Sequence, residues 1–150
     1  MINLLTVLTW TTKKAYLANY ADNESVKKAA TRLWNAIESV EIFLIIAMMV
    51  LTVVICLWYF FPYNNDPGRH YHPKHWVKFG FSNLIVVFIT TIGLCWMLTP
   101  NPSFNFGLLV KIGFINTFYA LVLYYIISNI INRKGKSNAY PWYILKNARL

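Results

Sequence analysis

Residues 42–65 read IFLIIAMMVLTVVICLWYFFPYNN, and this stretch of 24 residues contains no charged side chain. Two further uncharged runs, residues 79–110 and 112–132, are 32 and 21 residues long. One helix that crosses the hydrocarbon core of a bilayer needs about 20 apolar residues. The three runs therefore predict three transmembrane helices.

The composition of the chain favours the same class. Of its 150 residues, 57% are hydrophobic and only 13% are charged, and the mean hydropathy is +0.44. Soluble domains carry about 25% charged residues, so this chain has too few to cover a core with a hydrated surface. We predict an all-α integral membrane protein and expect it in a bacterial inner (plasma) membrane.

The first predicted span continues from a long amphipathic helix. Apolar residues recur at helical spacing from Val26 to Val40, and no Gly or Pro occurs from there to Phe61. We therefore predict one helix over residues 24–61. At 1.5 Å per residue it is about 57 Å long, which exceeds the bilayer core. Its first part is expected to project or bend, and to pack on the N-terminal segment, another neighbour or the membrane surface.

The remaining segments complete a single membrane domain over residues 1–150. The N-terminal residues hold too few apolar side chains to span, which indicates an interfacial helix or a shallow dip. The segments are an interfacial segment at 1–20, a loop at 69–78, a second span at 81–98, a third span at 106–131 and a basic aromatic tail at 133–150.

The positive charge lies in the second part of the chain. Residues 1–66 carry five Lys or Arg and five acidic residues, whereas residues 67–150 carry nine Lys or Arg and no acid. Such a field attracts anionic lipid, nucleotide or nucleic acid, although it is also the ordinary positive-inside signal of a membrane protein. The candidate anion- or lipid-binding residues are Arg69, Lys74, Lys78, Arg133, Lys134, Lys136, Lys146 and Arg149.

Two further features are open to a binding or a membrane interpretation. The tail contains three aromatic residues near cations, namely Tyr140, Trp142 and Tyr143. They suit the stacking of nucleic-acid bases, but they equally suit a membrane interface. Lys111 interrupts the uncharged runs, so it either snorkels towards water or faces an anion. A nucleotide or oligonucleotide partner is thus one hypothesis.

Three histidines form the one metal-like grouping of the sequence. His70, His72 and His75 lie close together, but their spacing matches no specific metal site and no cysteine completes one. A pH-sensing group or an interfacial anchoring loop are the alternatives. We assign no metal and no cofactor, and we keep the three histidines as weak candidates.

The third span carries a stripe of small and hydroxyl-bearing residues on one helical face. Such a stripe lets membrane helices pack closely and form hydrogen bonds, but in an oligomer it also suits the lining of a wetted pore. The pore-lining candidates are Gly113, Asn116, Thr117, Ala120, Tyr124 and Ser128.

Enzymatic activity is not expected. Proton-coupled transport and acid–base catalysis usually need a carboxylate inside the spans, and all five acidic residues lie outside them. The sequence also holds no Gly-rich phosphate loop, no nucleophile–base motif and no His-Glu-x-x-His motif.

The layout resembles that of small pore-forming membrane proteins from bacterial stress and phage-defence systems, and also that of small viral or accessory-subunit membrane proteins. The resemblance is one of plan alone: an amphipathic helix that runs into a span, followed by a helical hairpin. It implies first a homo-oligomeric pore or channel, gated by an anionic ligand at the basic face. The alternative is a structural or accessory subunit of a larger membrane complex, with partner membrane subunits.

Overall fold

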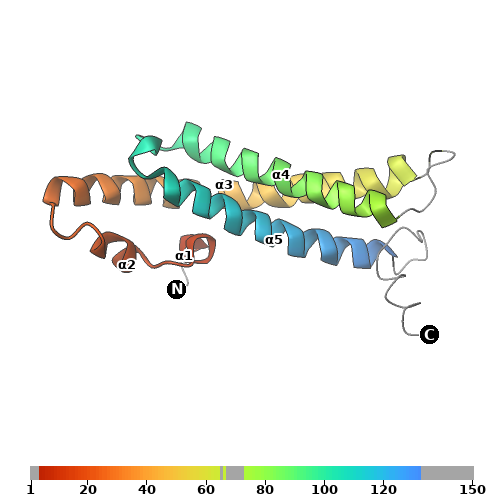
Figure 1. Ribbon diagram of the computed structural model, residues 1–150, viewed down its shortest axis with the longest axis horizontal. Helices are drawn as coiled ribbons and strands as arrows, with labels where there is room; N and C mark the ends of the chain where they lie inside the picture. Colours follow the sequence, from red (N-terminus) through yellow and green to blue (C-terminus); the bar gives the residue numbers. More distant parts are fainter. Residues whose placement is uncertain (1–3, 65, 67–72, 133–150) are drawn as a thin grey trace. The chain divides into compact units, whose positions relative to one another are not determined.

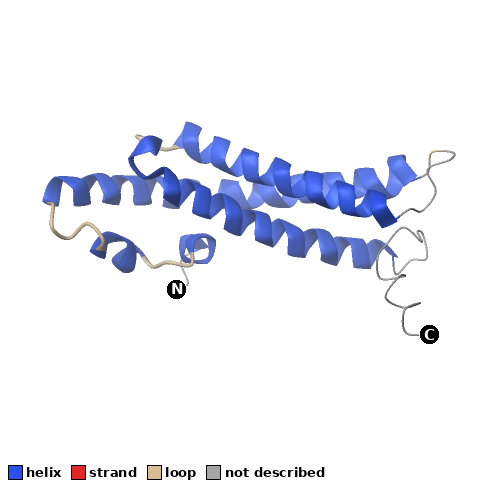
Figure 2. Ribbon diagram, viewed as in Figure 1, coloured by secondary structure: helices blue, strands red, loops and turns tan. Residues whose placement is uncertain are grey.

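The computed structural model describes residues 4–64, 66 and 73–132. Over these residues the chain is helical and has no strand (Figure 2). Three helical segments are long and apolar enough to cross a membrane, namely Glu24–Tyr63, Lys74–Leu98 and Pro102–Ile131. The predictions of an all-helical chain and of three helices of spanning length are therefore confirmed.

Figure 1 shows the order of the elements along the chain. The described part consists of α1 (Leu4–Thr9), α2 (Lys13–Ala18), α3 (Glu24–Trp58), the π-helical turn η1 (Tyr59–Tyr63), α4 (Pro73–Leu98), the 3-10 turn η2 (Pro102–Asn105) and α5 (Phe106–Asn132).

The N-terminal segment forms two short helices, α1 and α2, with a sharp turn between them. Trp10 in this turn has a φ of 50°, a left-handed conformation that bulky residues rarely adopt. The Thr9 hydroxyl donates to the carbonyl oxygen of Thr11 at 2.9 Å and accepts the Thr11 N–H at 3.3 Å, which stabilises the turn. Thr12 then caps α2 by accepting the N–H of Ala15 at 3.2 Å.

Helix α3 follows the predicted range closely. Asn23 accepts the N–H groups of Ser25 and Val26 with its side-chain oxygen, at 3.1 and 3.3 Å, and so satisfies donors at the helix start. The α-helical part ends at Trp58, and the chain continues through the π turn η1 to Tyr63. Pro62 explains the change, because its ring clashes with the carbonyl four residues earlier in an α-helix and the π turn is wider.

The predicted loop at 69–78 overlaps α4, which already begins at Pro73. Lys74, His75, Trp76 and Lys78 therefore belong to a helix, and their assignment to a loop was wrong. Proline is favoured in the first helical turn, where its missing N–H has no partner to lose. The prediction from the sequence placed Pro73 within the loop instead.

The first of two compact units consists of Met1–Met48 and Val87–Thr117. The apolar stripe of the amphipathic part of α3 is buried here, including Leu33, Trp34 and Ile37. The Tyr16 ring of α2 lies 5.1 Å from the Trp34 ring, measured between centroids. Helix α2 therefore covers the stripe that the sequence analysis expected to pack on a neighbour.

Polar contacts reinforce the packing of α2 on α3. The Lys13 ammonium donates to the side-chain oxygen of Asn35 at 2.6 Å and lies 3.6 Å from a carboxylate oxygen of Glu38. Both partners are on successive turns of α3, so this lysine links α2 to the amphipathic part of α3.

The second compact unit consists of Met49–Val86 and Phe118–Leu150. Its described core gathers around Cys56, Tyr59, Phe60 and Tyr124, which are all buried. Partly buried side chains from α4 and α5 pack against these four. Each unit thus contains segments of all three long helices.

The first prediction concerns the fully buried Trp34. Trp34→Ala should lower the free energy of unfolding by about 3–5 kcal/mol, since it removes a large core side chain. The loss should fall at the lower end, because the indole N–H has no hydrogen-bond partner among the described residues. Denaturant titration in detergent micelles, followed by circular dichroism, measures this loss of stability.

Trp58→Ala is the matched control, since Trp58 lies on the same helix and is exposed. Equal losses in the two variants would contradict the packing described.

Candidate functional site

The predicted stripe of α5 lies on the buried face of that helix. Asn116, Ala120 and Ser128 are fully buried and Tyr124 is nearly so, while Thr117 is half-buried. The residues of α5 that the sequence singled out therefore face other parts of the same chain.

Asn116 joins three helices within the first unit. Its side-chain NH₂ donates to the hydroxyl of Thr91 in α4 at 2.8 Å and to the carbonyl oxygen of Leu44 in α3 at 3.3 Å. The side-chain oxygen of Asn116 has no partner within the described part of the chain. Thr117 instead bonds within α5, donating to the carbonyl oxygen of Gly113 at 2.8 Å.

Gly113 marks a close approach between α5 and α4. A Cβ placed on Gly113 would lie 3.0 Å from a ring carbon of Phe88 and 3.1 Å from Cγ1 of Ile92. These distances are shorter than ordinary van der Waals contact, so a larger residue needs both side chains to move. The absence of a side chain at Gly113 thus permits the packing of α5 on α4.

Tyr124 and Ser128 make the equivalent contacts in the second unit. The Tyr124 hydroxyl donates to the carbonyl oxygen of Trp76 at 3.1 Å. The Ser128 hydroxyl accepts the indole N–H of Trp76 at 2.9 Å and lies 3.6 Å from Sγ of Cys56. Trp76 thus ties the first turn of α4 to α5. The sequence analysis missed this role because it placed Trp76 in a loop.

Gly80 gives the second unit its own close helix contact. A Cβ on Gly80 would lie 3.2 Å from Cε1 of Tyr124. The buried face of α4 repeats every three or four residues, through Gly80, Asn83, Val87 and Thr91. That spacing was the signal in the sequence that could have identified Gly80 and Thr91.

Buried polar atoms without a partner also occur in the helices. Neither side-chain atom of Asn83 has a hydrogen-bond partner in the ranges described, and the same holds for the hydroxyl oxygen of Thr52. An unpaired amide in an apolar environment costs free energy. These unpaired atoms of Asn83 and Thr52 therefore lower the stability of the second unit.

Two of the predicted anion-binding residues lie in the described part. Lys74 and Lys78 are both exposed on the first turns of α4. The other six lie outside the described residues: Arg69, Arg133, Lys134, Lys136, Lys146 and Arg149. The basic surface proposed from the sequence therefore stays a prediction.

The weak metal candidates are only partly described. The ring nitrogen Nδ1 of His75 lies 2.9 Å from the hydroxyl of Tyr63. His70 and His72 lie outside the described residues, and among those described no three His, Cys, Asp or Glu side chains gather as a metal site would require. The His75 contact joins α4 to η1.

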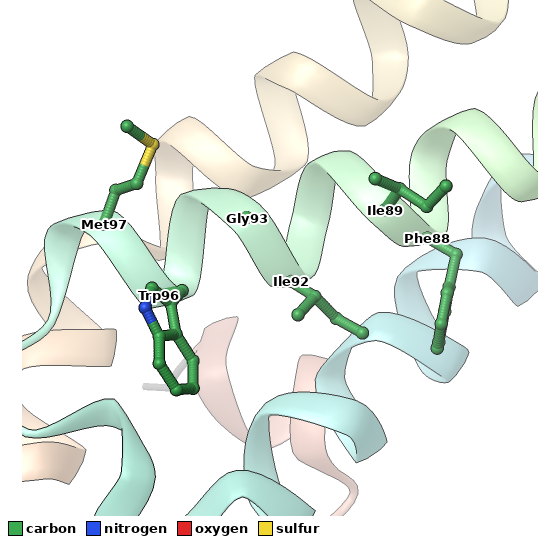
Figure 3. Close-up of a pocket in the computed structure, with 6 residues that line it drawn as sticks. All are labelled: Phe88, Ile89, Ile92, Gly93, Trp96 and Met97. Carbon is green, nitrogen blue, oxygen red and sulfur yellow. The ribbon is translucent and has the colours of Figure 1, made fainter.

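A shallow groove lies on the exposed side of α4 in the first unit. It has a volume of about 350 Å³, and its lining residues are Phe88, Ile89, Ile92, Gly93, Trp96 and Met97, as Figure 3 shows. All six come from one helix, and no charged side chain is among them. Such a groove suits an apolar chain or helix and offers no group for catalysis.

A comparison with known protein families, curated proteins and solved structures found no match for this chain.

The second prediction contrasts two glycines of the first unit. Gly113→Leu should destabilise the protein by about 1–3 kcal/mol or more, because its side chain overlaps Phe88 and Ile92. Gly93→Leu is the matched control, since a Cβ at Gly93 meets nothing within 4 Å. It should be neutral or stabilising, because leucine favours a helix over glycine by roughly 0.8 kcal/mol. Denaturant titration in micelles compares the two, and a tolerated Gly113→Leu would contradict the close approach.

Proposed function

We propose that this chain is an integral membrane protein whose three long helices span a bilayer. We further propose that it acts as a non-conducting structural or accessory subunit of a larger membrane assembly. The observation that supports this proposal is the burial of the polar α5 stripe against the chain's own helices.

The exposed faces of the long helices support insertion in a bilayer. Large apolar side chains are exposed along each of them, for example Phe43 on α3, Phe81 on α4 and Phe114 on α5. A soluble monomer rarely exposes apolar patches of this extent. In a bilayer, exposed apolar side chains contact lipid and not water. Polar side chains are stabilised there when they are buried inside the protein. The chain has this arrangement, with Asn116 and Ser128 buried.

The hydrogen bonds of the polar α5 side chains support the role of a subunit. In a pore, the stripe side chains would have to face water in the lumen of an oligomer. Here the side chains of Asn116, Tyr124 and Ser128 bond to groups of α3 and α4 in the same chain. The surface that is left for a partner is the apolar exterior of the long helices. This surface suits contact with lipid or with other transmembrane helices.

The amphipathic start of α3 supports a docking role outside the bilayer. The helix from Glu24 to Tyr63 has 40 residues, whereas about 20 cross the hydrocarbon core. The charged residues of α3 all lie between Glu24 and Glu41, so this part projects from the membrane with α2 packed on it. We place the protein in a bacterial inner membrane, since outer-membrane spans are typically barrels.

The third prediction tests conduction. Proteoliposomes containing the wild-type protein should show no ion flux above that of empty vesicles, and Tyr124→Ala should show none either. The variant should instead be less stable, because it leaves a cavity in the core of the second unit. Tyr125→Ala is the matched control, since the neighbouring Tyr125 is exposed.

Flux through the wild-type protein that rises in Tyr124→Ala and not in Tyr125→Ala would favour the pore. The size and symmetry of the detergent-purified particle give an independent reading. A ring of identical copies supports a pore, and a lone copy or one beside unrelated chains supports a subunit. Resistance to alkaline carbonate extraction tests insertion separately from both.

A further inference from the structure

A polar pocket lies in the first unit, between α2 and the start of α5. Its volume is about 210 Å³. The side chains that give it its character are those of Thr11, Tyr16, Asn19, Tyr20, Asn105 and Lys111. Of these residues, only Lys111 was singled out from the sequence, as a side chain that either snorkels towards water or faces an anion.

Lys111 supplies the positive charge of this pocket. Its ammonium group donates to the Thr11 hydroxyl at 2.7 Å, which uses one of its three hydrogens. Within residues 4–64, 66 and 73–132, no carboxylate lies within ion-pair distance of Lys111, whereas Lys13 lies 3.6 Å from Glu38. The exposed ammonium of Lys111 therefore keeps two donors and a full charge for an anion.

The two tyrosines add one neutral donor. The Asn105 side-chain NH₂ donates to the hydroxyl oxygen of Tyr20 at 2.8 Å and to that of Tyr16 at 3.4 Å. Both phenol oxygens are acceptors in these contacts, so Asn105 takes up neither O–H hydrogen. The hydroxyls of Tyr16 and Tyr20 also hydrogen-bond to each other. This contact uses one of the two O–H hydrogens and leaves the other for a ligand. Burial raises the pKa of Tyr16 to about 12, and its phenol therefore stays protonated at physiological pH. One cation beside a neutral hydroxyl donor, with no carboxylate in the lining, suits an anion with several oxygens.

Exposed apolar residues adjoin this polar group along the chain. Phe114 lies three residues after Lys111 on the same face of α5 and is 63% exposed. Trp10 precedes Thr11 and is exposed to the same extent. An aromatic side chain beside a lysine at the edge of a span is typical of the headgroup region of a bilayer. The neighbourhood therefore fits an anion that carries an apolar tail better than a free ion.

We propose that this pocket binds the phosphate of an anionic phospholipid headgroup, with the Lys111 ammonium as its counter-ion and a tyrosine hydroxyl as a further donor. The proposal rests on the insertion of the helices in a bilayer put forward above. Bound lipid fastens α2 to the start of α5, and so holds the N-terminal segment at the membrane surface.

The fourth prediction tests this site by lipid titration. Detergent-purified full-length protein is titrated with phosphatidylglycerol, or with phosphatidylcholine of the same acyl chains, and bound lipid is counted by native mass spectrometry. Wild type should bind phosphatidylglycerol more tightly. Lys111→Gln should weaken that binding about five-fold, the effect of one cation near an anionic lipid surface. Tyr20→Phe should weaken it less, and Lys111→Arg should retain it.

Lys14→Gln is the matched control, since Lys14 is an exposed lysine of α2 outside the pocket lining. Equal losses in Lys14→Gln and Lys111→Gln, or a loss in Lys111→Arg, would overturn the assignment. A competition with glycerol 3-phosphate separates the headgroup alone from the whole lipid. If it displaces phosphatidylglycerol at equal concentration, the pocket binds a soluble phosphate and the lipid proposal fails.

Failure of the lipid-binding proposal can be distinguished from failure of the proposed function. Ion flux in liposomes would remove the subunit role and leave lipid binding at Lys111 intact. Loss of the protein on carbonate extraction would remove insertion and is measured without any lipid titration. Helix content by circular dichroism shows in each variant whether the fold is retained.

Discussion

A polar side chain on an apolar helix is stabilised when it finds a hydrogen-bond partner within the protein, and this constraint orients the helices described here. Asn83 and Thr52 do not meet it within the described residues. Inside a bilayer no water is present to satisfy such a group, and leaving it unpaired costs free energy. Asn116 meets the constraint by bonding to Thr91 and to the Leu44 carbonyl, which sets α3, α4 and α5 at one level in the first unit. Without such contacts, helices in lipid have little to fix their rotation, because lipid tails are as apolar as leucine.

Around Trp76, the second unit meets the same constraint with different chemistry. Trp76 supplies its indole N–H to Ser128 and its carbonyl oxygen to Tyr124, so one residue of α4 satisfies two polar groups of α5. In both units the hydrogen bonds sit beside a glycine that lets the helices approach, Gly113 in the first and Gly80 in the second. Small residues bring the backbones close, and the polar groups then select the rotation at which they meet.

The sequence predicted the elements better than the contacts between them. Length and hydropathy were sufficient for the three long helices, and the 3.6-residue period identified the α5 stripe that includes Asn116 and Ser128. The same pattern serves a pore and a packing interface, so it did not predict which one the stripe forms. The bond between Asn116 and Thr91 joins residues 25 positions apart, and no local rule pairs them. The early start of α4 was missed because residues 69–78 were assigned to a loop, and the role of Trp76 was missed with it.

Hydrogen bonds contribute only part of the free energy that keeps the α5 stripe buried. Close packing contributes the larger part. Interhelical hydrogen bonds in membrane proteins contribute on average about 0.6 kcal/mol each, so those of Asn116, Tyr124 and Ser128 together amount to roughly 2–3 kcal/mol. If the stripe lined a pore, hydrogen bonds to water in the lumen would replace most of this free energy. They would not replace the contacts of Gly113 with Phe88 and Ile92, or the burial of Tyr124 against Gly80, because close-packed surfaces lose their dispersion energy once they separate. The stripe is therefore retained inside the chain chiefly by the fit of its small residues, and its polar groups set the rotation at which that fit occurs.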